Sequence, residues 1–306
     1  MVELINAFGE LGGFDEWIRV FEYNSKTSQL NPLPFEIMML MLTNISAIHT
    51  YLNQSFVADF IPRIKGALIR RFRASNSQEI KEIDQTLVLK LLQEAQSLLC
   101  KYPKPEEIYE FTETVQLELA IKFLSVQRIE KRLAGIKWIR EIAKKVATSE
   151  EYRKQGNAQI ISTSPESTKY LNVTIFGELL LRNNTFEIIL GDSIHPEIVK
   201  ESGEVLYLLE KYEAMPLKLI DLIWSSCEGK PEAEVKAIID VIIKISPVLT
   251  REAVQSLRTK ILSIPHERFT EMHLNLIKNV AMNTLPTGLH ALDQDPADTI
   301  SKSDII

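Results

Sequence analysis

Apolar residues recur about every 3.6 positions through nearly the whole chain, the period of an amphipathic helix. No segment sustains the alternation of apolar and polar residues that marks a half-buried strand. Between positions 57 and 72, for example, one helical face carries Val57, Phe60, Ile61, Ile64, Leu68 and Phe72. The pattern therefore predicts an all-α protein.

Helices are predicted at residues 57–72, 76–102, 105–124, 128–147, 169–182, 185–190, 196–212, 216–227, 231–245, 251–262 and 270–282. Asn76 is expected to cap the second of these, with Glu79 completing a capping box three positions later. Four later joints are marked by prolines, which suit the first turn of a helix: Pro196, Pro216, Pro231 and Pro247.

Helices joined by short turns in antiparallel succession are typical of a HEAT or armadillo-like array, an α-solenoid. One or two closed helical bundles remain the alternative, because no internal repeat of about 35 to 47 residues is visible. We expect an N-terminal repeat part at 1–151, a loop or linker rich in Gly, Pro, Ser and Thr at 152–168, a C-terminal repeat part at 169–284 and a disordered tail at 285–306.

The charge balance argues against a nucleic-acid binder. Forty-one acidic residues against 35 basic ones give a net charge of -6, the opposite of the basic surface that binds phosphate backbones. The one strong local bias is a basic cluster, Arg63, Lys65, Arg70, Arg71 and Arg73, with no aromatic residue interleaved to stack bases. A solvated outer face explains this cluster best, and Arg63, Arg70 and Arg73 are the candidate partner-binding residues.

No catalytic, cofactor or metal site is predicted. Cys100 and Cys227 lie in no CxxC or Cys/His spacing that would hold zinc, and the five histidines show no paired metal spacing. The Gly229-Lys230 pair is not part of a phosphate-binding loop, because Trp224 and Pro231 stand where such a loop needs Gly and Ser or Thr.

The helix around Trp224 is expected to lie inside the array. Its apolar residues go almost all the way round, with Leu217, Ile220, Trp224 and Cys227 on one stripe. Trp224 and Cys227 are therefore interpreted as packing residues, and Cys227 as an inert thiol rather than a nucleophile.

Neither a membrane span nor a secretory signal is predicted. The longest uncharged stretch, residues 37–58, contains Asn44, His49, Asn53 and Gln54, so it reads as a buried helix that runs into a turn. The first residues include acidic side chains and no basic segment before an apolar run. A cytoplasmic location is expected, with the nucleus as an alternative.

Two helical blocks, Leu117–Ile136 and Leu219–Ile238, carry a resemblance to a known family, together with GELGGF at Gly9–Phe14 and SIPHERF at Ser263–Phe269. They resemble the non-catalytic helical region of the giant fat-facets-type ubiquitin-specific proteases, over roughly residues 3 to 284 of this chain. The resemblance implies an armadillo-like region upstream of a cysteine protease domain that removes ubiquitin from substrates.

No catalytic residue is carried over by this resemblance. The family's cysteine box is a Gly-Asn-Thr-Cys type sequence, and the nearest match, Gly156-Asn157-Ala158, lacks the cysteine. The resemblance thus implies a scaffold that binds protein partners or ubiquitinated substrates and needs no cofactor. The alternative is an independent helical-repeat adaptor with no link to ubiquitin, since one fold hosts many functions.

Overall fold

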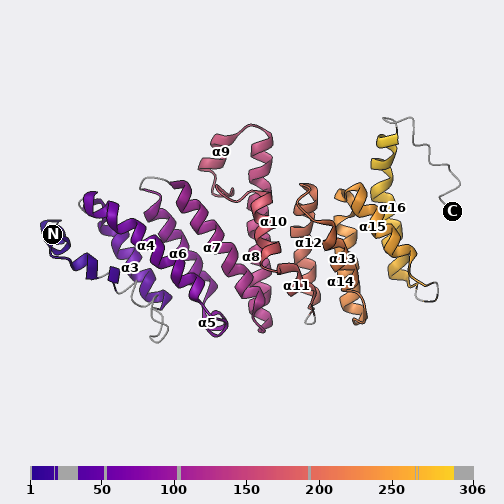
Figure 1. Cartoon of the computed structure of the whole chain (residues 1–306), viewed down its shortest axis with the longest axis horizontal. Coiled ribbons are helices and arrows are strands. Elements are labelled where there is room, and N and C mark those ends of the chain that lie inside the picture. The colour runs from indigo at the N-terminus through magenta and orange to yellow at the C-terminus, as the bar shows by residue number, and fades with distance from the viewer. Residues whose placement is uncertain are drawn as a thin grey trace. The chain divides into compact units, whose positions relative to one another are not determined.

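The computed structural model describes residues 2–16, 18–19, 34–51, 54–101, 105–191, 194–265, 267 and 269–292. Its helices form two compact units, unit 1 (Met1–Asn172) and unit 2 (Val173–Ile306). The described residues contain helices and turns and no strand, which confirms the all-α prediction (Figure 1).

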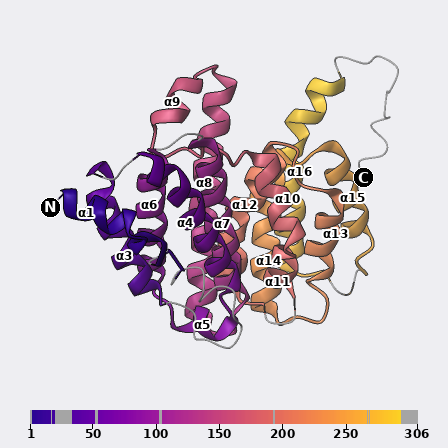
Figure 2. The ribbon, with the colours of Figure 1, turned by 60° about the vertical axis from the view of Figure 1, so that its left-hand side comes forward.

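Unit 1 contains the helices of the N-terminal part of the chain. They are α1 (Val2–Glu10), α3 (Phe35–Ile48), the 3-10 turn η1 (His49–Tyr51), α4 (Gln54–Ala74), α5 (Ser77–Glu82), α6 (Gln85–Leu99), α7 (Pro105–Ser125), α8 (Ile129–Lys154) and α9 (Ala158–Thr163). Helix α3 packs on α6, α6 on α7 and α7 on α8, so these helices lie side by side (Figures 1 and 2). Their shared core buries Leu42, Leu91, Leu98, Phe123 and Ile139.

The predicted helix 76–102 is wrong in one respect, because it is two helices. Asn76 does cap the first, accepting a hydrogen bond from the Glu79 amide at 2.9 Å. The backbone then becomes extended at Ile83, and the Asp84 side chain accepts from the Thr86 amide at 2.9 Å. A second N-cap therefore starts α6 two residues after α5 ends.

Unit 2 contains the remaining helices. They are α10 (Val173–Arg182), α11 (Thr185–Leu190), α12 (Pro196–Lys211), α13 (Leu217–Ser225), α14 (Glu232–Ile245), the 3-10 turn η2 (Ser246–Val248), α15 (Arg251–Leu262) and α16 (Glu271–Leu292). Its closest packing is α12 against α14, which buries Leu206, Leu209, Ile238 and Ile242. The bounds of α11 and α15 are those that the sequence predicts.

Two expected boundaries look different in the structure. The segment 152–168 contains the end of α8 and the short helix α9, which lies beside one end of α8 (Figure 2), and the two units divide after Asn172. Residues 285–292, expected in the tail, continue α16 to Leu292. The rest of the expected tail, 293–306, lies outside the described residues.

Candidate functional site

Both cysteines sit where a thiol is kept protonated. Burial raises the pKa of Cys100, next to Tyr109, and burial raises the pKa of Cys227 to about 11. The Cys227 Sγ donates a long hydrogen bond, 4.0 Å, to the Ile223 carbonyl oxygen. A cysteine nucleophile needs the opposite, a lowered pKa beside a base.

Metal and membrane sites are absent from the described part of the chain. No three His, Cys, Asp or Glu side chains there come together in a group that could hold a metal ion. None of the described helices is long and apolar enough to cross a membrane.

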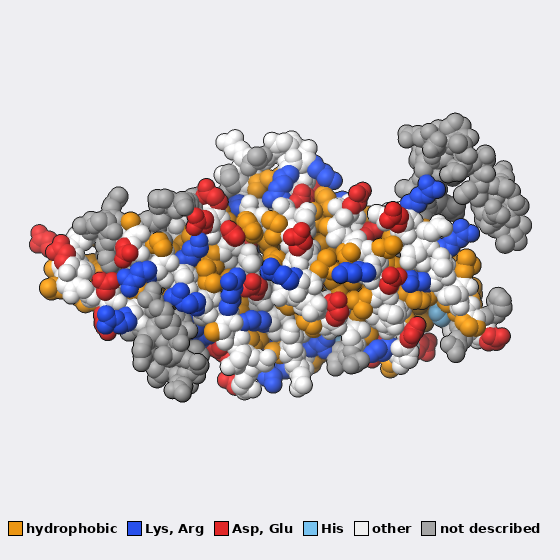
Figure 3. All heavy atoms as spheres, viewed as in Figure 1, with side chains coloured by type: hydrophobic (Ala, Val, Ile, Leu, Met, Phe, Trp, Pro, Cys, Tyr) orange, Lys and Arg blue, Asp and Glu red, His pale blue; other side chains and the backbone are white. Residues whose placement is uncertain are grey.

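The basic cluster of α4 is engaged in ion pairs with other elements. Arg63 pairs with Asp15 at 2.6 Å, Lys65 with Glu107 at 3.1 Å and Arg73 with Glu118 at 3.2 Å. Basic and acidic side chains accordingly lie interspersed on the face shown in Figure 3.

The other two members of the cluster differ from each other. Arg70 is exposed, whereas Arg71 is buried, lies over the Phe35 ring at 4.1 Å and pairs with Glu79. The cluster is therefore not one face, and much of its charge fastens α4 to α5 and α7. Its use as a partner-binding surface stays a prediction.

The placement of Trp224 corrects the sequence interpretation. Helix α13 buries Leu219, Ile220 and Ile223, but Trp224 is only half-buried and Leu217 is 44% exposed. The helix has a solvent side because its neighbours cover only one face of it. It is not enclosed on all sides as its composition suggests.

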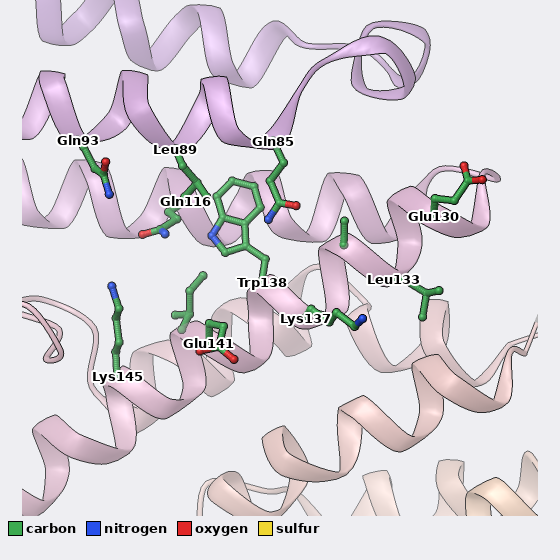
Figure 4. Close-up of a pocket in the computed structure, with 12 residues that line it drawn as sticks. Gln85, Leu89, Gln93, Gln116, Glu130, Leu133, Lys137, Trp138, Glu141 and Lys145 are labelled. Carbon is green, nitrogen blue, oxygen red and sulfur yellow. The ribbon is translucent and has the colours of Figure 1, made fainter.

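Unit 1 has a groove that crosses α6, α7 and α8, with a volume of about 670 Å³. Gln85, Leu89 and Gln93 line it from α6, at spacings of four that place them on one helix face, and Gln116 lines it from α7. The α8 side is formed by Glu130, Leu133, Ala134, Lys137, Trp138, Glu141, Ile142 and Lys145. Figure 4 shows Gln85, Leu89, Gln93 and Gln116 on one side of this groove and Lys137, Glu141 and Lys145 on the other.

Trp138 occupies the middle of this groove and is 4% exposed. Its ring contacts the edge of Phe123, with centroids 5.8 Å apart, so packing fixes its position. Its indole nitrogen, Nε1, is buried and has no hydrogen-bond partner. Figure 4 shows the indole between Gln116 and Gln85, and a buried donor left unpaired costs about 1–3 kcal/mol.

The charges on the rim are of two kinds. Glu130 pairs with Arg128 at 2.6 Å, and Glu141 pairs with Lys144 at 2.9 Å and Arg140 at 3.1 Å. The hydrogen bond from Lys144, followed by that from Arg140, lowers the pKa of Glu141.

Lys137 and Lys145, in contrast, are exposed and have no ion pair or side-chain hydrogen bond within the described residues. Because the acidic groups of the rim are neutralised and these two lysines are not, the groove carries an excess of positive charge.

A second, smaller hollow of about 110 Å³ shares Gln116, Ile142 and Lys145 with the groove and is bounded by the loop that follows α9. That loop is held by Glu113 of α7, whose carboxylate accepts hydrogen bonds from the backbone amides of Lys169, Tyr170 and Leu171 at 2.7, 3.0 and 2.8 Å. Burial raises the pKa of Glu113, and these three hydrogen bonds oppose the rise. The loop therefore forms a fixed wall at this end of the groove.

A third hollow lies at α1 and α3 and is lined mainly by apolar side chains, among them Leu4, Ile5, Phe8 and Ile48. It lacks the groove's combination of an unpaired buried donor, amide side chains and unpaired charge.

A family model for the UBP24/USP9X/USP9Y ARM repeat matches residues 110–284, more than half of the 306 residues. The chain belongs to this armadillo-repeat family. The matched region includes most of α7, all of α8 and α9, and the helices of unit 2 through most of α16. The armadillo-like fold and the resemblance to fat-facets-type proteases are both confirmed.

Relatives from three kinds of ubiquitin hydrolase are similar to the chain. Ubiquitin carboxyl-terminal hydrolase 9Y of Mus musculus is 27% identical over 254 residues, which cover 80% of this chain and 9% of the relative. The probable ubiquitin carboxyl-terminal hydrolase FAF of Drosophila melanogaster is 21% identical over 313 residues, 92% of this chain and 11% of the relative. Ubiquitin carboxyl-terminal hydrolase 34 of Homo sapiens is 23% identical over 210 residues, 69% of this chain and 5% of the relative.

The chain thus spans about a tenth or less of the length of these relatives. The part of the family that it represents is the armadillo-repeat region and not the catalytic domain. No solved structure matches the chain significantly.

The groove was not predicted from the sequence. The one signal was the absence of charge at positions 85, 89 and 93 on a single face of α6, which does not show what that face adjoins.

Proposed function

We propose that this chain is a non-catalytic protein-interaction region of a ubiquitin-specific protease, which recruits protein partners or ubiquitinated substrates for ubiquitin removal. The proposal includes a cytoplasmic location, with the nucleus as a second site of action. Membership of the armadillo-repeat family supports the link to ubiquitin hydrolases. The groove across α6, α7 and α8 is the observation that supports recruitment.

The chemistry of the groove suits a polypeptide better than a small metabolite. Primary amides such as those of Gln85, Gln93 and Gln116 both donate and accept hydrogen bonds, as a peptide backbone does. Leu89, Leu133 and Ile142 supply apolar contact between them. Enzyme and cofactor sites, by comparison, converge a few polar groups in an enclosed apolar cavity.

The first test concerns catalysis. The purified chain is incubated with a fluorogenic ubiquitin substrate and, separately, with an active-site-directed ubiquitin probe. We expect neither turnover nor labelling, because both thiols have raised pKa values. Turnover that is lost in Cys100→Ala or Cys227→Ala would overturn the non-catalytic assignment.

The second test concerns recruitment. The chain is expressed in excess in cells, proteins close to it are identified by proximity labelling, and the ubiquitination of those proteins is measured. A region that recruits substrates competes for them when it is present in excess, so ubiquitinated forms of the labelled proteins should accumulate. Labelled proteins with unchanged ubiquitination would contradict the link to ubiquitin removal.

A further inference from the structure

We propose that the groove binds an extended, acidic polypeptide segment that places carboxylates near Lys137 and Lys145 and main-chain carbonyls against the groove's amide and indole donors. This inference rests on the proposed function, because it names the chemistry of the segment that the region recruits. The unpaired lysines, the unpaired indole and the length of the groove support it separately.

The unpaired lysines of the groove favour a partner with negative charge. Lys137 and Lys145 have no ion pair within the described residues, whereas Glu130 pairs with Arg128 just before α8, and Glu141 pairs with Arg140 and Lys144 on it. An acidic segment gains two new ion pairs here without breaking existing ones. A basic segment would have to compete with Arg128, Arg140 and Lys144 for the two glutamates.

The uncharged hydrogen-bond donors of the groove favour a partner with many hydrogen-bond acceptors. Trp138 Nε1 is buried without an acceptor, and no hydrogen bond within the described residues is made by the side chains of Gln85, Gln93 or Gln116. An extended segment presents a carbonyl oxygen at every residue, and those carbonyls lack partners of their own. Because Nε1 is buried, side chains that line the groove have to move for such an oxygen to reach it.

Geometry sets the spacing of the carboxylates. Eight residues of α-helix separate Lys137 from Lys145, a rise of about 12 Å. Four residues of an extended segment span about 13 Å and place the first and fifth side chains on the same side. Two acidic residues four positions apart therefore match the two lysines.

Single-stranded nucleic acid is the other ligand that Lys137 and Lys145 would attract, but the burial of Trp138 argues against it. Base stacking needs an exposed ring face, whereas Trp138 is 4% exposed and lies against Phe123. The indole can offer its edge to an acceptor but not its face to a base.

The test is a selection of random twelve-residue peptides displayed on phage against the purified 306-residue chain, run in parallel on two variants of equal charge. The first is Lys137→Glu with Lys145→Glu. The second, a matched control, is Lys200→Glu with Lys236→Glu, two exposed lysines of unit 2. None of these four lysines makes an ion pair within the described residues, so both variants should fold, which circular dichroism checks.

We expect the unmodified chain and the control to enrich peptides with Asp or Glu pairs four apart, and the groove variant to lose them. A synthetic peptide of the enriched sequence should bind the groove variant about tenfold more weakly or worse, since tenfold corresponds to loss of about 1.4 kcal/mol. No enrichment, enrichment of non-acidic peptides, or equal enrichment on the groove variant would overturn the proposal. So would tighter binding of a fluorescent oligouridine than of the acidic peptide.

Trp138→Phe tests the indole separately from the lysine charges. It removes the unpaired N–H together with part of the buried ring volume, so some stability is lost and affinity is measured where circular dichroism shows the variant folded. Affinity for the selected peptide should fall several-fold. Unchanged affinity would show that the indole N–H does not contribute to peptide binding.

The cell experiment and the peptide selection distinguish the two proposals. If cells show competition for ubiquitinated partners but the peptide selection shows no acidic preference, this inference fails and the proposed function stands.

Discussion

Gly135 of α8 lies against Leu124 of α7 with no room for a side chain between them. A Cβ placed on Gly135 would fall 2.5 Å from the Leu124 backbone nitrogen and 2.7 Å from the Ala120 carbonyl oxygen. The atoms it would meet belong to the backbone, so they cannot turn aside as a side chain can. This contact sets the separation of the two helices that carry Gln116 and Trp138 into the groove.

Gly135→Ala should therefore destabilise the chain although alanine is the better helix former. We expect a loss of about 1–3 kcal/mol in the free energy of unfolding, as for other overpacked cores, measured by urea denaturation. Gly66→Ala is the matched control, because the added Cβ there approaches only the flexible end of Arg70 at 3.2 Å. That variant should be neutral or gain up to about 1 kcal/mol from helix propensity; equal effects at both positions would contradict close packing of α7 on α8.

Glu113 should control the order of the loop after α9. Glu113→Gln replaces one acceptor oxygen by an NH2 group that cannot accept from the amides of Lys169, Tyr170 and Leu171, so at least one buried amide loses its partner. We expect a cost of about 1–3 kcal/mol and faster hydrogen exchange at these three amides. Glu106→Gln, at an exposed position of the first turn of α7, is the control. Unchanged exchange at residues 169–171 would show that the loop is held by other contacts.

Local chemistry explains which helix bounds the sequence predicts well. The Asn76 cap depends on a residue three positions away, and α15 begins where Thr250 accepts from the Ala253 amide. The break at Ile83 was missed because the apolar stripe continues across it, and only the second cap, at Asp84, marks it. The apolar period favours one continuous helix here, but the N-cap at Asp84 starts a new one.

The groove and the exposure of α13 depend on contacts between helices that are distant in sequence. Trp224 looks like a core residue because it shares a stripe with Leu217, Ile220 and Cys227, yet it is half-buried, since burial depends on which helices lie beside it. Trp138 looks similar in sequence but is almost fully buried, with α6 and α7 lining the same hollow. The spacing of apolar residues within one helix does not distinguish these two tryptophans.

The two sides of α13 should respond differently to truncation. Ile223→Ala removes a side chain that is 1% exposed, so we expect a loss of about 2–5 kcal/mol. Leu217→Ala, on the side that is 44% exposed, should cost less than about 1 kcal/mol, as surface substitutions do. Chemical denaturation of both variants measures the difference. A loss at Leu217 as large as that at Ile223 would restore the interpretation that α13 is enclosed on all sides.

The reactivity of Cys227 should report its buried environment through pH. Burial raises its pKa to about 11, and only the thiolate reacts with iodoacetamide. In a Cys100→Ser variant, which leaves one thiol, labelling should be slow at neutral pH. The labelling rate should increase nearly tenfold per pH unit, with no plateau below about pH 11, whereas the rate for a free cysteine levels off near its pKa of about 8.5.

The raised pKa of Cys227 also makes the free energy of unfolding depend on pH. The stability linked to the protonated thiol is fully present below the pKa of the unfolded chain and is lost as pH rises through the pKa of the folded chain. The urea midpoint should therefore fall across that alkaline range, and it should fall less in Cys227→Ala. Rapid labelling at pH 7, with a plateau near neutrality, would mean that Cys227 has an activating partner and would reopen the question of a nucleophile.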